Sequence, residues 1–91
     1  MSISLEIPAA LRDCADGRRV LTLSTTTIQS AIDEVESVHP ALYRNLCDDT
    51  GALRVHLNLF LNGSHVRDRK ALNTQLNDGD VITILTAVSG G

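Results

Sequence analysis

Apolar and polar residues alternate at the start of the chain, which is the pattern of a β-strand with one buried face. The alternation runs from Ile3 to Ile7 and stops at Pro8, which cannot donate to a strand ladder. A polar stretch around Asp16-Gly17 then provides a turn, and Arg19–Leu23 predicts a second strand. We expect the two strands to form a hairpin with a long connection.

The apolar period changes to three and four residues after position 26, and this spacing predicts an amphipathic helix. The apolar positions are Ile28, Ala31, Ile32, Val35 and Val38. Thr26 and Gln29 have the spacing of a capping box at the helix start. His39-Pro40 predicts its end, because the residue before a proline is disfavoured in the helical region. A short second helix is expected over Ala41–Leu46.

The second half of the chain predicts three further strands and one tight turn. Arg54–Leu61 alternates most regularly, with Val55, Leu57, Leu59 and Leu61 on one face and Arg54, His56, Asn58 and Phe60 on the other. Asn62-Gly63 predicts a type I′ hairpin turn, which needs a positive φ at both positions. The return strand is expected over His65–Arg67 and the final strand over Val81–Thr86, with an irregular segment at Leu72–Leu76 between them.

The order of these elements predicts an α+β fold of two layers. Five short strands would form a mixed sheet, with the main helix packed on one face and a short second helical segment beside it. We expect the first and last strands to lie centrally, because their apolar alternation is strong, and the short fourth strand to lie at an edge. This order is similar to that of the β-grasp, or ubiquitin-like, fold. That fold alone does not define a function.

Composition restricts the classes of function. The 91 residues suffice for one domain, and 43% apolar with 21% charged residues is typical of a globular protein. A net charge of -3 argues against a nucleic-acid partner, which would need clustered basic residues. The nearest such cluster is Arg67, Arg69 and Lys70, interrupted by Asp68. We interpret it as a solvated loop rather than a binding patch.

The absence of long apolar runs and the two cysteines indicate where the protein is located and whether its thiols are reactive. No run approaches the roughly 20 apolar residues of a membrane span, and the N-terminus lacks the pattern of a signal peptide. We therefore expect a cytoplasmic protein that does not associate with a membrane. Cys14 and Cys47 are too few for a disulfide framework and have acidic neighbours. We expect both to be structural rather than reactive.

Candidates for catalysis or metal binding are few. His39, His56 and His65 lack the spacing of a zinc site, so no metal is expected. No pair of nucleophile and base is apparent either, and a core of this size leaves little room for a catalytic cleft. We expect that the protein is not an enzyme by itself.

The most specific feature is the C-terminal stretch Asp78–Gly91. The turn Asp78-Gly79-Asp80 is followed by the apolar strand VITIL and by the sequence TAVSGG. In this arrangement the chain resembles the ThiS/MoaD family of bacterial sulfur carriers, and its length and extra helical piece look closer to the MoaD and CysO branches. Such carriers often have proline just after the last strand, where Thr86 stands here. This departure leaves the branch open.

The resemblance implies a covalent courier rather than an enzyme. An E1-like adenylating enzyme would use ATP to activate the carboxylate of Gly91, and sulfur would then replace the adenylate to give a thiocarboxylate. The sulfur would pass to an accepting synthase, and a metalloprotease that exposes or recycles the diglycine is a further candidate partner. The chain itself would bind no cofactor. Residues 1–87 would form the β-grasp domain and residues 88–91 a flexible tail, in which Val88, Ser89, Gly90 and Gly91 enter the active sites of partners.

Two apolar side chains are expected on the outer face of the sheet. Phe60 and Leu85 would lie on neighbouring strands, and by the resemblance this is where such carriers dock on their activating enzymes. The alternative is that both are scattered apolar residues, which are normal on a protein surface.

Three functions are compatible with these features. The first is a sulfur carrier that serves the synthesis of molybdopterin, thiamin, cysteine or a sulfur-containing metabolite. The second is an interaction module in which the diglycine is incidental. The third is a ubiquitin-like modifier that is conjugated to proteins through Gly91. A natural chain that is longer and is trimmed to the diglycine fits the sequence as well.

Overall fold

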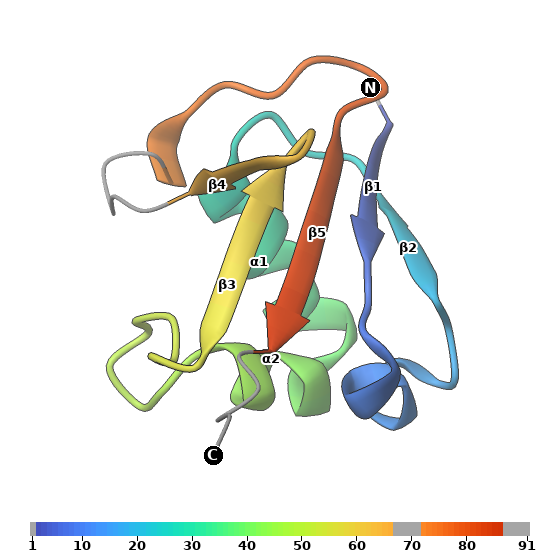
Figure 1. Cartoon of the computed structure of the whole chain (residues 1–91), viewed down its shortest axis with the longest axis vertical. Helices are drawn as coiled ribbons and strands as arrows, with labels where there is room; N and C mark the ends of the chain where they lie inside the picture. The colour runs from blue at the N-terminus through green and yellow to red at the C-terminus, as the bar shows by residue number, and fades with distance from the viewer. Residues whose placement is uncertain (1, 67–71, 87–91) are drawn as a thin grey trace.

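The fold is one mixed sheet covered on one face by helices, as a computed structural model shows for residues 2–66 and 72–86 (Figure 1). Within these residues the sheet has five strands in the order β2-β1-β5-β3-β4. The strands are β1 (Ile3–Glu6), β2 (Val20–Leu23), β3 (Leu57–Leu61), β4 (Ser64–Val66) and β5 (Val81–Thr86). Strands β1 and β5 pair in parallel, and the other neighbours pair antiparallel. The predicted β-grasp fold, with inner first and last strands and a short fourth strand at the edge, is confirmed.

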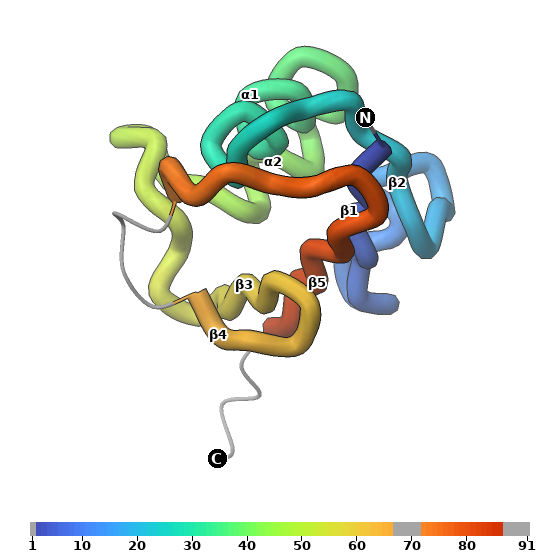
Figure 2. The backbone as a smooth tube through the Cα atoms, turned by 90° about the horizontal axis from the view of Figure 1, so that it is seen from above, coloured from blue at the N-terminus to red at the C-terminus, as the bar shows by residue number. Residues whose placement is uncertain are grey.

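The helical layer consists of α1 (Ile28–Val38) and α2 (Pro40–Leu46), joined at His39. Seen from above, both helices lie on one side of the sheet (Figure 2). The predicted capping box was wrong by one residue. Thr27 is the N-cap, and its hydroxyl oxygen accepts a hydrogen bond from the Ser30 N–H at 3.0 Å. The helix starts later because the Thr26 carbonyl accepts a hydrogen bond from the Leu76 N–H, which holds Thr26 against another segment of the chain.

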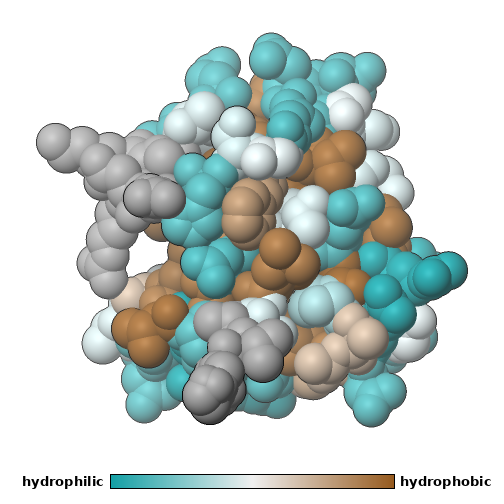
Figure 3. All heavy atoms as spheres, in the orientation of Figure 1, coloured by the Kyte–Doolittle hydropathy of each residue, from teal (hydrophilic) through white to brown (hydrophobic). Residues whose placement is uncertain are grey.

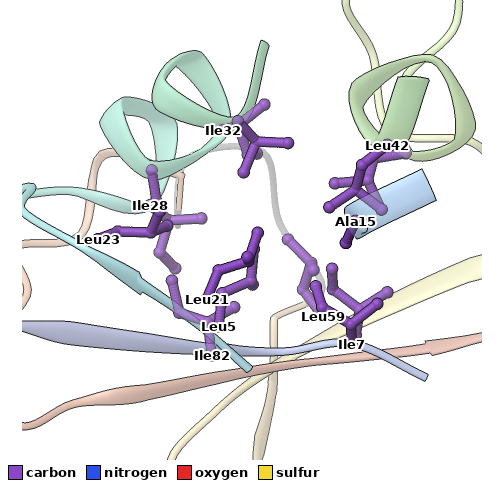
Figure 4. Close-up of a cluster of buried hydrophobic side chains, with 14 of the residues drawn as sticks. Leu5, Ile7, Ala15, Leu21, Leu23, Ile28, Ile32, Leu42, Leu59 and Ile82 are labelled. Atoms are coloured by element: carbon purple, nitrogen blue, oxygen red, sulfur yellow. The ribbon is translucent and has the colours of Figure 1, made fainter. Parts of the chain in front are cut away.

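The core lies between the two layers and is built from aliphatic side chains. Figure 4 shows Ile28 and Ile32 of α1 pointing toward Leu5, Leu21 and Ile82 of the sheet. Ile28 and Ile82 are 1% and 2% exposed. Burial of each such side chain contributes about 1.5–3 kcal/mol, so this interface is the main source of stability.

One predicted core position, Val38, was wrong, because this side chain is 60% exposed. Val38 is the last residue of α1 and lies beside Leu21 and Thr22 of the edge strand β2. No further strand lies beyond β2 in the described sheet to cover it.

The connection between β1 and β2 contains a 3-10 helix, Ala9–Ala15, where we had expected only a polar turn. Its Leu11 and Ala15 are buried, and the helix packs against α2. Asp16 then ends it in the left-handed conformation, with φ of 57°. The hairpin of β1 with β2 is as predicted.

Strand β3 begins at Leu57, so the prediction of a strand from Arg54 was wrong for its first three residues. The Arg54 N–H donates to the Leu46 carbonyl, and the Leu57 N–H donates back to the Arg54 carbonyl. These bonds hold residues 54–56 in a turn, so they cannot join the ladder with β5. Val55 is fully exposed as a result, contrary to its predicted place on the buried face.

The hairpin of β3 and β4 is confirmed. Asn62 and Gly63 have φ of 50° and 86°, as a type I′ turn requires. Strand β4 covers Ser64–Val66, and Arg67 of the predicted return strand lies outside the described residues, as do Arg69 and Lys70. Residues 72–76 are irregular, as expected. Among the helices that the structure describes, none is long and apolar enough to cross a membrane.

Candidate functional site

Strand β5 leads directly into the stretch that carries the diglycine. It lies between β1 and β3 and ends at Thr86 (Figure 1). Its Ile82 and Ile84 are 2% and 1% exposed, so one face of the strand is fixed in the core. The predicted tail residues Val88, Ser89, Gly90 and Gly91 lie outside the described residues, as does the predicted domain boundary after residue 87. The stretch is therefore attached to a strand that is hydrogen-bonded on both sides.

The motif Asp78-Gly79-Asp80 fixes the start of β5. One oxygen of Asp80 accepts from the Asn77 N–H at 2.8 Å, and the other accepts from the Asn62 side-chain amide at 3.0 Å. These hydrogen bonds, the Asn77 bond first, hold the pKa of Asp80 below its ordinary value. The side-chain oxygen Oδ1 of Asn62 accepts in turn from the Val81 N–H at 2.9 Å. The motif thus joins the β3–β4 turn to β5.

The outer face of the sheet carries a row of side chains that crosses every described strand. The pairing registers place Val20, Glu6, Thr83, Phe60 and His65 opposite one another in that order. The Thr83 hydroxyl donates to a Glu6 carboxylate oxygen at 2.8 Å, which links β5 to β1 on this face. The space-filling view shows apolar side chains exposed among polar ones here (Figure 3).

The structure brings together the two residues of the predicted docking patch. Thr83 pairs with Phe60 and Leu85 pairs with Asn58, so Phe60 and Leu85 are diagonal neighbours on the same face. Leu85 is 47% exposed, and Phe60 is partly exposed. Their placement agrees with the prediction, and their role in docking stays a prediction.

Alternation along the sequence placed Asn58 on the face of Phe60, but His65, which belongs to the same patch, was missed. The His65 ring packs edge-on against Phe60, with 5.0 Å between the ring centroids. His65 Nε2 also forms a 2.8 Å hydrogen bond with Asn58 Oδ1. The register of the Asn62-Gly63 turn was the available signal, because a two-residue turn places His65 opposite Phe60.

A hollow of about 370 Å³ lies beside the end of β5 on the same side. Arg12 and Arg19 line it together with Glu6, Thr83 and Leu85. Arg12 is held in place by a 3.2 Å hydrogen bond from its Nε to the Ile7 carbonyl. We call this feature the arginine hollow.

Both cysteines are free thiols. Cys47 is buried, and burial raises the pKa of its thiol, so it stays neutral and is a poor nucleophile. Cys14 is partly exposed, and its sulfur lies 3.3 Å from the side-chain amide nitrogen of Asn45. The raised pKa agrees with a structural role for Cys47, and the role of Cys14 stays a prediction.

Comparison with known proteins shows similarity to one family and to several individual proteins. A family model described as the ThiS family matches residues 5–91. The sulfur carrier protein CysO of Mycobacterium tuberculosis is 31% identical over 93 residues, with full coverage of both chains. The small archaeal modifier protein 1 of Haloferax volcanii is 33% identical over 85 residues, covering 91% of this chain and 93% of its own. A crystal structure of the BexX/CysO complex of Amycolatopsis orientalis contains a chain that is 32% identical and superimposes with a TM-score of 0.85, covering 98% and 99% of the two chains.

Proposed function

The chain belongs to the ThiS family, and from this premise we propose that it is a sulfur carrier whose Gly91 carboxylate is adenylated and then converted to a thiocarboxylate. The observation that supports this most is the extent of the match. The family model covers residues 5–91, and the CysO relatives are similar over the whole chain. The match therefore extends through the positions of the diglycine.

The chemistry needs a partner because a carboxylate is a poor acyl donor. In the proposed cycle an E1-like enzyme uses ATP, and a Gly91 oxygen attacks the α-phosphorus and releases pyrophosphate. Sulfide from the sulfur donor then attacks the Gly91 carbonyl carbon, forming the C–S bond and displacing AMP, which leaves the thiocarboxylate. Gly90 and Gly91 suit this path because a residue without Cβ can pass a narrow channel. The partners supply ATP and catalysis, and the carrier itself catalyses no step.

The folded part of the chain serves as the docking body. The anchored strand β5 gives the tail a fixed origin, and Phe60 and Leu85 provide apolar contact area beside it. A CysO protein forms a complex with BexX in a solved structure, so docking as a folded unit is known for a similar protein. The proposed partners are the activating enzyme, a sulfur-accepting synthase and a metalloprotease that exposes or recycles the diglycine. We place the cycle in the cytoplasm, where free thiols such as Cys47 stay reduced.

Intact mass spectrometry tests this function. The full chain is incubated with its cognate E1-like enzyme, ATP and a sulfur donor. We expect a mass increase that corresponds to replacement of one oxygen by sulfur, and none when ATP is omitted. An unchanged mass with an activating enzyme that consumes ATP in the presence of the chain would contradict the proposal.

A second candidate function is that of a protein modifier. It is favoured by the 33% identity to small archaeal modifier protein 1. In this case the activated Gly91 would acylate lysine side chains of other proteins. Lys70 is the last basic residue before the diglycine, so tryptic digestion of cell extracts would leave residues 71–91 as a branch on the modified lysines. These branched peptides, the remnants of conjugation, should disappear when the chain is deleted from the cell. Formation of the thiocarboxylate without such remnants favours the carrier function.

A further inference from the structure

The arginine hollow holds two guanidinium groups, of which that of Arg12 donates to the Ile7 carbonyl. Among residues 2–66 and 72–86, neither Arg12 nor Arg19 forms an ion pair. The nearby Glu6 accepts a hydrogen bond from Thr83 instead. The chain as a whole carries a net charge of -3, so the two arginines form a local positive site on a negatively charged protein. Two guanidinium groups in one hollow form a site for anions, because each can bind a carboxylate with two parallel hydrogen bonds.

The hollow lies where a partner of the tail must come close. Ile84 and Leu85 line it, and Thr86 is the next residue along the chain. Residues 87–91 can span at most about 18 Å, at 3.3–3.6 Å per residue. An enzyme whose active site receives Gly91 must therefore place its surface within that distance of Thr86, which directly follows Leu85 at the hollow. The hollow also adjoins Leu85 of the apolar docking patch, so both belong to one surface.

This placement identifies the occupant as protein rather than nucleotide. A charge at the rim of an interface acts mainly on the rate of encounter and on orientation. Along the chain, six residues separate Leu85 at the hollow from Gly91, whose carboxylate is activated in the proposed cycle. We propose that Arg12 and Arg19 bind acidic side chains of the activating enzyme and so orient the carrier on it. The inference rests on the sulfur-carrier function proposed above.

Steady-state kinetics with matched variants test the inference. The double variant Arg12→Gln and Arg19→Gln removes both charges from the hollow. The control, Arg18→Gln with Arg44→Gln, removes the same charge from exposed positions that do not line it. Thiocarboxylate formation is measured with the cognate activating enzyme at low and at high ionic strength. We expect the hollow variant to raise KM about tenfold at low salt with kcat unchanged, and the control to change KM little.

The salt dependence of KM and a variant that restores the charges distinguish a docking role of the two arginines from a structural one. The KM of the unmodified chain is expected to rise with salt, because salt screens the attraction between the arginines and the enzyme. The hollow variant lacks this attraction, so its KM should change little with salt. Arg12→Lys with Arg19→Lys keeps the charges but not the paired hydrogen bonds, and it is expected to recover part of the loss. Thermal unfolding of each variant shows whether the Arg12 bond to Ile7 matters for the fold.

Several results would overturn the inference. One is an equal KM for the hollow variant and the unmodified chain, and another is an equal increase in the control. Saturable binding of inorganic phosphate that depends on both arginines, together with an unchanged KM, would assign the hollow to a small anion. If the unmodified chain gains no sulfur at all, the proposed function fails as well. If the unmodified chain gains sulfur and the hollow variant has the same KM, only the inference about the arginines fails.

Discussion

Replacing Ile84 and Leu85 by alanine, one at a time, separates the two faces of β5. The residues are adjacent in the strand, yet Ile84 is 1% exposed and Leu85 is 47% exposed. Truncating a fully buried aliphatic side chain costs about 2–5 kcal/mol, because the cavity adds to the lost transfer energy. Leu85 contributes about half of the 1.5–3 kcal/mol of full burial, so its removal costs about 1 kcal/mol. We expect Ile84→Ala to be the more destabilising variant by about 2 kcal/mol.

For partner binding we expect the opposite order, with a larger effect of Leu85→Ala than of Ile84→Ala. Leu85 lies on the outer face beside Phe60, so Leu85→Ala removes part of the proposed docking area while the fold remains. We expect its KM for thiocarboxylation to rise about five- to tenfold, which corresponds to about 1 kcal/mol of lost contact. Ile84→Ala is expected to keep a normal KM under conditions where it is folded. In a domain of this size its melting temperature should fall by at least about 8 °C.

Two measurements decide between the faces. Denaturant unfolding gives the free energy of each variant, and kinetics with the activating enzyme give KM and kcat. The assignment is wrong if Leu85→Ala loses as much stability as Ile84→Ala. It is also wrong if the KM of Leu85→Ala is unchanged while that of folded Ile84→Ala rises.

Three further predictions concern the tail, the turn before β5 and the cysteines. Deleting Gly91, or adding one residue after it, should abolish thiocarboxylation and leave the melting temperature unchanged; intact mass and thermal unfolding check this. The lowered pKa of Asp80 means that the folded state favours its ionised form. Its contribution to stability is thus present above the unfolded pKa, near 3.8, and is lost as the pH falls through the lower folded pKa. Asp80→Asn should make unfolding less pH-dependent below about pH 4, and an unaltered pH profile would argue against this role. Replacing Cys14 and Cys47 together should leave sulfur transfer intact, because the sulfur is placed on Gly91; a folded variant that fails to form the thiocarboxylate would refute that placement.

The sequence was sufficient where local pattern and turn chemistry decide the structure. Alternation placed Ile82 and Ile84 inward, and the Asn62-Gly63 turn defined the β3–β4 hairpin. Together these features put Phe60 and Leu85 on one outer face. Such positions follow from the two-residue period of a strand, which needs no knowledge of distant partners.

The predicted element boundaries were wrong where a hydrogen bond to a backbone group distant in sequence sets the local conformation. Arg54 and Val55 continue the alternation of β3, but a hydrogen bond to Leu46 holds this segment in a turn. The start of α1 shifted by one residue for the same reason, because Thr26 is held by Leu76. Alternation and capping rules describe neighbours in sequence, so neither can show such a bond.

The arginine hollow could not be found from sequence pattern. Arg12 lies in the 3-10 helix, a short element without a clear apolar period, and Arg19 lies just before β2. Their proximity to Leu85 depends on the pairing of β1 with both β2 and β5. Only the assembled sheet brings these residues to one place.

The parallel pairing of β1 and β5 has a mechanical consequence. Tension applied to the tail acts along β5, which is hydrogen-bonded to β1 on one side and to β3 on the other. A pull along the strand loads these bonds in shear and together, rather than peeling them one after another. In the proposed cycle, an enzyme that draws Gly91 into its active site would pull on this strand without unfolding the domain, and the carrier would be released intact for another cycle.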